Sequence, residues 1–177
     1  MIEAVRMVMD FFEDGGSGAL GIPLHINTIA ATVDRDGAET VPTIASLVDD
    51  SRNGVTARRR WPQGASMPAL LIFDMGTTWP EGVQQGLQDG VTSVGIFCVL
   101  DQSATEEAFE DLGYLMRGVR MCINDMAESA QESDRTRNGI ILTDLDGIED
   151  TPPDVEIEDA LVAAQMVVRW KVRDTSP

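Results

Sequence analysis

The stretch VTSVGIFCVLDQSATEEAFEDLGYLMRGVRMCINDM, residues 91–126, decides the fold of this chain. Its opening residues, 91–100, are apolar on both faces, which is typical of a central strand in a sheet. The tetrapeptide S-A-T-E, residues 103–106, matches a capping box, in which side chains satisfy backbone N–H groups at a helix start. Apolar residues then recur at spacings of three and four, which predicts a long helix with one buried face. They are Phe109, Leu112, Met116, Val119, Ile123 and Met126.

The N-terminal part of the chain adds helices and a pair of strands. Apolar spacing predicts a helix over residues 1–14 and a short second helix over 22–33. Residues 43–75 form a predicted strand pair, TIASLV and ALLIFDM. Between these strands, an Asn-Gly turn starts a hairpin arm, VTARRRW, at residues 55–61.

The C-terminal part completes a strand–long helix–strand–strand unit over residues 91–174. IILTDL, residues 140–145, predicts a strand, and the segment 162–174 alternates apolar and polar residues as a half-buried strand does. The segments 77–90 and 147–159 are predicted loops, the second of them acidic.

These elements predict an α/β (α+β) fold in a single domain, residues 1–177. The predicted architecture is a single mixed β-sheet with one long helix and the N-terminal helix packed on it. A chain of this length buries about 70% of the surface that it exposes when unfolded, so it can form a core without disulfides or metals.

The charge of the chain is its most unusual property. Thirteen basic residues stand against thirty acidic ones, a net charge of −17, and Lys171 is the only lysine. A chain this acidic is repelled by DNA and by anionic membranes, and no apolar run reaches the length of a membrane span. The excess of aspartate and the near absence of lysine resemble proteins of extreme halophiles, although an acidic mesophilic protein remains the alternative.

Patterns that often mark catalysis or cofactor binding are weak in this chain. GGSGALG, residues 15–21, matches a dinucleotide-binding fingerprint, but a predicted helix precedes it where a strand is required. DLDGIED, residues 144–150, departs from the calcium-loop spacing, so only loose binding of a hard cation stays open there. His25 is the only histidine, and Cys98 and Cys122 are expected to be buried free thiols. We therefore expect no enzyme, no catalytic residue, no cofactor and no dedicated metal site.

The candidate functional residues belong to contacts between proteins. The dense positive patch Arg58, Arg59, Arg60 and Trp61 combines two residue types that are enriched at interface hot spots. Against a net charge of −17, a contact with an acidic protein surface is favoured there over nucleic acid. The other candidates lie on predicted outward faces of the long helix and the last strand. They are Tyr114, Met121, Arg169, Lys171 and Arg173.

The order of these elements resembles that of the tail terminator proteins, also called tail completion proteins, of tailed viruses. The likeness is one of pattern and length from residue 40 onward, and it is carried by residues 68–75, 91–126 and 162–174. The resemblance implies a ring, a hexamer in that family, that ends polymerisation of the tail tube and docks the head–tail connector. It also implies a non-catalytic protein of the virion tail or neck, assembled in the host cytoplasm, with DNA only as passing cargo. Together with the resemblance, the halophile-like composition suggests a tailed virus whose host is a salt-loving archaeon.

Two other interpretations stay open. One is another neck, head-completion or tail tube protein. The other belongs to a different class, a small halophilic cytosolic protein that binds a ligand or acts as an enzyme. A six-fold assembly in molar salt favours a ring, whereas a stable monomer with a ligand-sized pocket favours the cytosolic class.

The acidic composition predicts a dependence on salt. We expect the protein to unfold or dissociate as the salt concentration falls, because the screening length grows from about 3 Å at 1 M to about 10 Å at 0.1 M. Melting curves recorded over this range test the expectation. A melting temperature that does not change with salt would contradict it.

Overall fold

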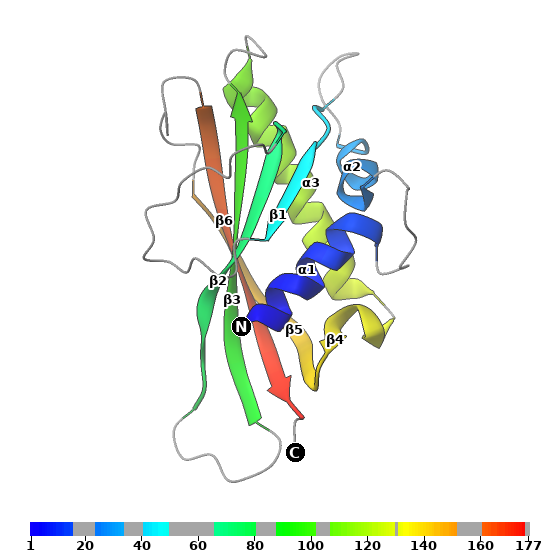
Figure 1. Ribbon diagram of the computed structural model, residues 1–177, viewed down its shortest axis with the longest axis vertical. Helices are drawn as coiled ribbons and strands as arrows, with labels where there is room; N and C mark the ends of the chain where they lie inside the picture. Colours follow the sequence, from blue (N-terminus) through cyan, green and yellow to red (C-terminus); the bar gives the residue numbers. More distant parts are fainter. Residues whose placement is uncertain are drawn as a thin grey trace.

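Six strands and three α-helices make up the described structure, a computed structural model (Figure 1). The described residues are 1–15, 24–33, 41–49, 66–80, 88–101, 107–129, 131–151 and 161–175. The helices are α1 (Ile2–Asp14), α2 (His25–Ala30), α3 (Ala108–Glu128) and the short 3-10 helix η2 (Glu132–Arg135). The strands are β1 (Ser46–Asp49), β2 (Ala69–Thr78), β3 (Gln88–Asp101), β4 (Thr136–Arg137), β5 (Ile140–Thr151) and β6 (Leu161–Asp174).

All six strands belong to one mixed sheet, in the order β1-β2-β3-β6-β5-β4. The pair β1 and β2 is parallel, and every other pair is antiparallel. The helices pack against one face of this sheet, which we call the inner face (Figure 1). The predicted architecture of a mixed sheet with the long helix and the N-terminal helix on it is therefore confirmed.

The two longest strands, β3 and β6, form the centre of the sheet. They pair antiparallel over the full length of both, from Gln88 opposite Asp174 to Asp101 opposite Leu161. Every second residue of β6 faces the helices and is buried, and Trp170 is fully so. The predicted alternation of this strand is confirmed, because the inward set and the outward set fall on opposite faces as a period of two requires.

Helix α3 confirms the predicted long helix, but its buried face differs from the predicted one. The buried arc also includes Leu115 and Cys122, so its centre lies further round the helix than the predicted stripe. As a result Phe109, predicted to be buried, lies beyond the edge of the arc and is 51% exposed. At the other edge, Tyr114 and Met121 are half-buried and pack against the core, so the prediction that they lie opposite it is wrong.

The two N-terminal helices are present as predicted, although the second is shorter than predicted. Helix α1 ends at Gly15, whose left-handed φ of 66° and N–H bond to the Phe11 carbonyl, 2.9 Å long, form a C-cap. The predicted helix over residues 22–33 narrows to α2. The Asn27 side chain binds both backbone groups of Ile44 at 2.7 and 2.8 Å, which fixes α2 beside the segment that leads into β1.

Several strand bounds differ from the predicted ones. Strands β2 and β3 extend into the predicted loop at 77–90, and β5 continues to Thr151 through part of the predicted acidic loop. Backbone pairing explains these extensions, because β2 pairs with β3 there while β3 and β5 both pair with β6, and ladder bonds form regardless of the polar side chains. Strand β1 starts at Ser46 rather than at residue 43. The predicted arm at 55–61 and the predicted capping box at 103–106 lie outside the described residues.

A tight turn at Asn138 and Gly139 joins β4 to β5. Asn138 and Gly139 have positive φ values of 49° and 80°, as a tight hairpin between β4 and β5 requires. Among the described helices, none has the length and apolar character that a membrane crossing needs.

Two glycines of α3 offer a matched pair for testing the helix packing. A Cβ built on Gly118 would lie 2.8 Å from the Ala30 Cβ and 3.0 Å from its Cα, whereas one built on Gly113 meets nothing within 4 Å. We expect Gly118→Ala to lower the free energy of unfolding by about 1–3 kcal/mol through overpacking against α2. Gly113→Ala should raise it by up to about 1 kcal/mol, because alanine favours the helix.

Denaturant unfolding of both variants in the same molar salt measures these two changes. Equal effects of the two substitutions would show that α2 does not pack closely on α3.

Candidate interaction surface

The sheet face that points away from the helices, the outer face, divides into an apolar end and a charged end. At the apolar end Leu71, Val99 and Ala163 form a small buried cluster, with Phe97 half-buried beside them. At the charged end the outward residues of β6 are Arg169, Lys171 and Arg173, which we call the β6 cation row. The three predicted candidates on the last strand therefore share one face.

Each member of the cation row pairs with a carboxylate of a neighbouring strand. Arg173 binds Asp89 of β3, Lys171 lies 4.0 Å from Asp144 of β5, and Arg169 lies 3.7 Å from Glu149 of β5. The side chains of the three cations are 44–56% exposed. The row is therefore a line of positive charge at the surface, flanked by one carboxylate of β3 and two of β5.

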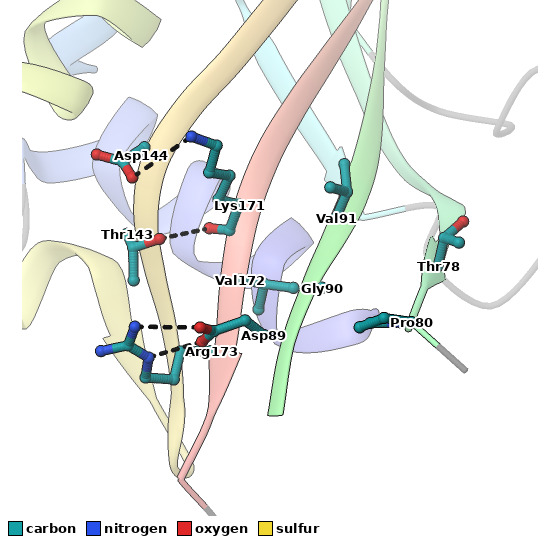
Figure 2. A pocket seen from close by; sticks show the side chains of 10 residues that line it. All are labelled: Thr78, Pro80, Asp89, Gly90, Val91, Thr143, Asp144, Lys171, Val172 and Arg173. Atoms are coloured by element: carbon teal, nitrogen blue, oxygen red, sulfur yellow. Dashed lines mark hydrogen bonds and ion pairs between the residues drawn. The ribbon is translucent and has the colours of Figure 1, made fainter. Parts of the chain in front are cut away.

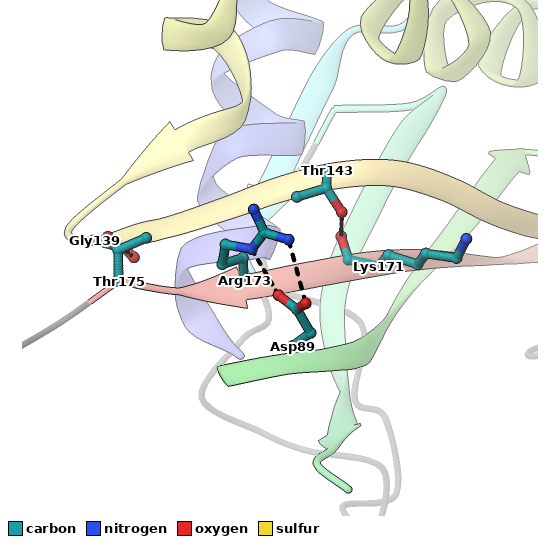
Figure 3. Close-up of polar contacts among 6 residues, drawn as sticks. All are labelled: Asp89, Gly139, Thr143, Lys171, Arg173 and Thr175. Carbon is teal, nitrogen blue, oxygen red and sulfur yellow. Dashed lines mark hydrogen bonds and ion pairs between the residues drawn. The ribbon is translucent and has the colours of Figure 1, made fainter. Parts of the chain in front are cut away.

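The pair Arg173–Asp89 is the tightest of the three. These residues are direct cross-strand partners, and the guanidinium donates two bonds in a fork, Nε to Oδ1 at 2.7 Å and Nη2 to Oδ2 at 3.2 Å (Figure 3). The hydrogen bond and the charge of Arg173 lower the pKa of the Asp89 carboxyl, and the same contact raises the pKa of Arg173. Bidentate geometry gives this pair a fixed orientation.

The other two pairs are loose because β5 is irregular. Its register against β6 shifts twice, between Leu142 and Asp144 and between Leu145 and Gly147. These bulges place Asp144 opposite Lys171 and the bare backbone of Gly147 under the Arg169 guanidinium. Exposed pairs near 4 Å contribute little to stability, so Lys171 and Arg169 keep their charge available to another carboxylate.

A groove of about 560 Å³ lies beside the cation row (Figure 2). The ends of β2 and β3, together with β5 and β6, supply its lining. These residues are Thr78, Pro80, Asp89, Gly90, Val91, Thr143, Asp144, Lys171, Val172 and Arg173. In Figure 2 the Lys171 side chain runs along the sheet towards Asp144, while Val91 and Pro80 lie on the other side of β6. The groove thus has apolar walls and a charged rim.

Glycine is required at one position beside the groove. A Cβ on Gly90 would lie 2.6 Å from the Trp79 ring and 2.8 Å from the Thr78 carbonyl oxygen. Trp79 is half-buried and packs against the core from the end of β2. This close approach of ring to backbone fixes the end of the β2–β3 pair where the groove begins.

The predicted interface residues do not form one surface. The cation row lies on the outer face, whereas Tyr114 and Met121 pack against the core on the helix side. Arg58, Arg59, Arg60 and Trp61 lie outside the described residues. Asp89, Asp144 and Glu149 could not be singled out from the sequence, because only the strand register shows which carboxylate stands beside which cation.

The two cysteines, the histidine and the acidic segment 144–150 all lie in surroundings that are typical of structural rather than catalytic residues. Cys98 and Cys122 are buried and free, as predicted, and burial raises the pKa of Cys98 to about 12. His25 lies 3.4 Å from an Asp125 carboxylate oxygen and packs edge-to-face on Phe11 with ring centroids 5.3 Å apart. Within the described ranges, no three acidic, cysteine or histidine residues are grouped as metal ligands would be, and residues 144–150 lie along β5.

A scan against protein-family models finds no match for this chain, and a search of curated proteins finds none. Support for a function therefore comes from the residues and surfaces of the chain.

The Asp89–Arg173 pair predicts a pH dependence of stability. A carboxyl whose pKa is lowered by folding stabilises the folded state above its ordinary pKa of about 3.9, and this contribution is lost as the pH falls through the lower folded value. We expect Asp89→Asn to unfold more easily than the wild type at pH 6, and the difference to shrink below about pH 4. Thermal unfolding at several pH values measures this.

Asp146→Asn is the matched control, since Asp146 is an exposed carboxylate on β5. The Asp89–Arg173 pair would not stabilise the fold if both variants followed the same pH profile.

Proposed function

We propose that this protein is a structural virion protein, a tail terminator whose copies form a ring at the top of the tail tube. The ring ends polymerisation of the tube and provides the surface on which the head–tail connector docks. In this proposal the protein is not an enzyme, and its partners are other copies of itself, the tail tube protein and the connector proteins.

The segments that carry the resemblance occupy the middle of the fold. Residues 68–75 contribute most of β2, residues 91–126 contribute β3 and nearly all of α3, and residues 162–174 contribute β6. These elements are neighbours, because β2, β3 and β6 are adjacent in the sheet and α3 packs on β3 and β6. The resemblance therefore concerns one packed unit rather than scattered pieces.

The observation that carries the proposal is the outer face of the sheet. None of the described helices covers it, and it keeps Val91, Phe97 and Val167 half-buried beside the exposed cation row. Apolar groups at a charged rim are the usual composition of a protein contact surface. In a chain with a net charge of −17, a positive row suits an acidic protein partner.

A ring also requires two different surfaces on each copy, because its contacts are heterologous. The two sides of this fold differ in that way, since one is a sheet face with a cation row and the other is a layer of helices. The excess of acid over the whole chain repels phosphate, which suits a channel through which DNA passes without being held.

The proposal predicts a closed assembly of limited size. In about 3 M salt, where charges are screened within a few ångströms, we expect purified protein to form rings of six copies of the 19.2 kDa chain. Added during assembly of its tube protein, it should shorten the tubes and appear at one end in electron micrographs. Light scattering and imaging measure the size and the position of the ring.

Three other results would exclude the proposal. Long polymers of the chain alone would indicate a tube protein, and rings found only at the head vertex would indicate a head-completion protein. A folded monomer at every salt concentration would leave no ring at all.

The groove favours one candidate of a different class, a halophilic ligand-binding protein. Its volume of about 560 Å³ lies within the range of small-molecule sites, and its apolar walls meet a few polar groups. Native mass spectrometry of protein purified from its own host decides between the two. A stoichiometric small molecule, lost in a Val91→Trp variant that fills the groove, would support binding of a metabolite instead of assembly.

A further inference from the structure

We propose that an exposed knob on α3 of one copy docks into the groove beside the cation row of the next copy. The knob consists of Phe109, Glu110 and Gly113 in the first turns of α3. This inference rests on the self-association proposed above and names the two surfaces that meet. Phe109 enters the apolar part of the groove, and Glu110 pairs with Lys171 at its rim.

Phe109 is unusually exposed for an aromatic residue. At 51%, it is more exposed than any other large hydrophobic side chain in the part of the chain that the structure describes. One turn further along, Gly113 is exposed, and a Cβ there would have open space around it. A partner can therefore approach the helix backbone beside the ring, and removing the phenylalanine side chain from water stabilises such a contact.

The groove has the chemistry that such a knob requires. Val91 and Pro80 line it with apolar surface, and the hydrocarbon stem of Lys171 adds more. Its volume of about 560 Å³ leaves room for a phenyl ring together with a neighbouring carboxylate. The groove is thus a receptor for an apolar side chain rather than for charge alone.

Charge complementarity selects an acidic occupant. Lys171 lies 4.0 Å from Asp144 and Arg169 lies 3.7 Å from Glu149, both as exposed pairs that contribute little in water. A carboxylate brought in beside a buried ring replaces these loose contacts with a better shielded one. The forked Arg173–Asp89 pair is tighter and keeps its own partner.

The knob and the groove lie too far apart to meet within one molecule. The groove is lined by Asp89, Gly90 and Val91 at the start of β3. This strand ends at Asp101, and α3 begins beyond that far end, at Ala108 (Figure 1). A strand of this length spans more than about 40 Å. The contact therefore joins two copies through different surfaces, which closes a ring or extends a polymer according to the rotation between copies.

The test compares self-association of full-length variants in molar salt. Phe109→Ala and Lys171→Glu should each raise the dissociation constant at least about tenfold, as loss of an interface hot spot does. The charge exchange Lys171→Glu with Glu110→Lys should bring the constant back towards the wild-type value, because it restores an opposite pair between copies. Sedimentation measures the constants, and melting curves verify that each variant is folded.

Two controls separate this contact from general effects. Ile2→Ala removes the other exposed large hydrophobic side chain, which is 39% exposed and lies on α1. Arg6→Glu repeats the change of charge on α1, away from the groove. Both controls should associate like the wild type.

The outcomes distinguish the contact from the function on which it rests. If Phe109→Ala and Lys171→Glu formed wild-type rings, the contact would be wrong and the ring proposal would stand. A wild-type protein that stays monomeric would contradict both the contact and the ring proposal. Binding of a short DNA duplex that is lost in Lys171→Glu, while association is unchanged, would assign the cation row to nucleic acid and overturn the inference.

Discussion

The alternation of side chains along β6 is the constraint on which the rest of the structure depends. Inward residues such as Trp170 and Val172 are buried under the helices, while Lys171 and its outward neighbours reach the surface. Since a strand has a period of two, a slip of one residue would bury the cations and expose the tryptophan. Full-length pairing with β3 on one side and nearly continuous pairing with β5 on the other fix this register.

Close contacts also fix the elements that surround β6, both within the sheet and between the sheet and α3. On the outer face, a Cβ at Gly95 would lie 2.2 Å from the Phe73 ring, so the ring lies directly on the strand backbone. At the far end of α3, Arg135 donates to the Ala127 and Ser129 carbonyls of the helix end and to the Thr143 carbonyl of β5. A cation at a helix C-terminus also interacts favourably with the negative end of the helix dipole. This contact connects the helix layer to the strand that carries the loose acidic partners.

The parts of the fold that the sequence predicted are those with strong local periodicity. The β3–α3 stretch and the alternating last strand could be assigned as strand and helix from their own spacing, without tertiary information. The spacing did not locate the edge of the buried arc, so Phe109 was assigned to the core although it is 51% exposed. Helix propensity and period define a stripe only to within about one residue step of 100°, and tertiary packing decides which side it takes.

The candidate site was less predictable than the fold. The outward position of Arg169, Lys171 and Arg173 followed from alternation, but their partners come from β3 and β5, up to 84 residues away in sequence. The two bulges in β5 shift its register, and no turn or glycine pattern in the sequence predicts both of them. A groove lined by segments of four strands likewise has no local signal, since none of these segments forms it alone.

The composition of the chain limits how copies of it can recognise one another. With thirty acids against thirteen basic residues, two copies repel at a distance in dilute salt. In concentrated salt the repulsion is screened beyond about 3 Å, and so is any long-range attraction. Specific association must then come from groups in direct contact, where apolar burial excludes water and a charge pair escapes screening. A single exposed aromatic beside a carboxylate and a groove with loosely held cations meet this requirement, whereas a diffuse positive patch does not.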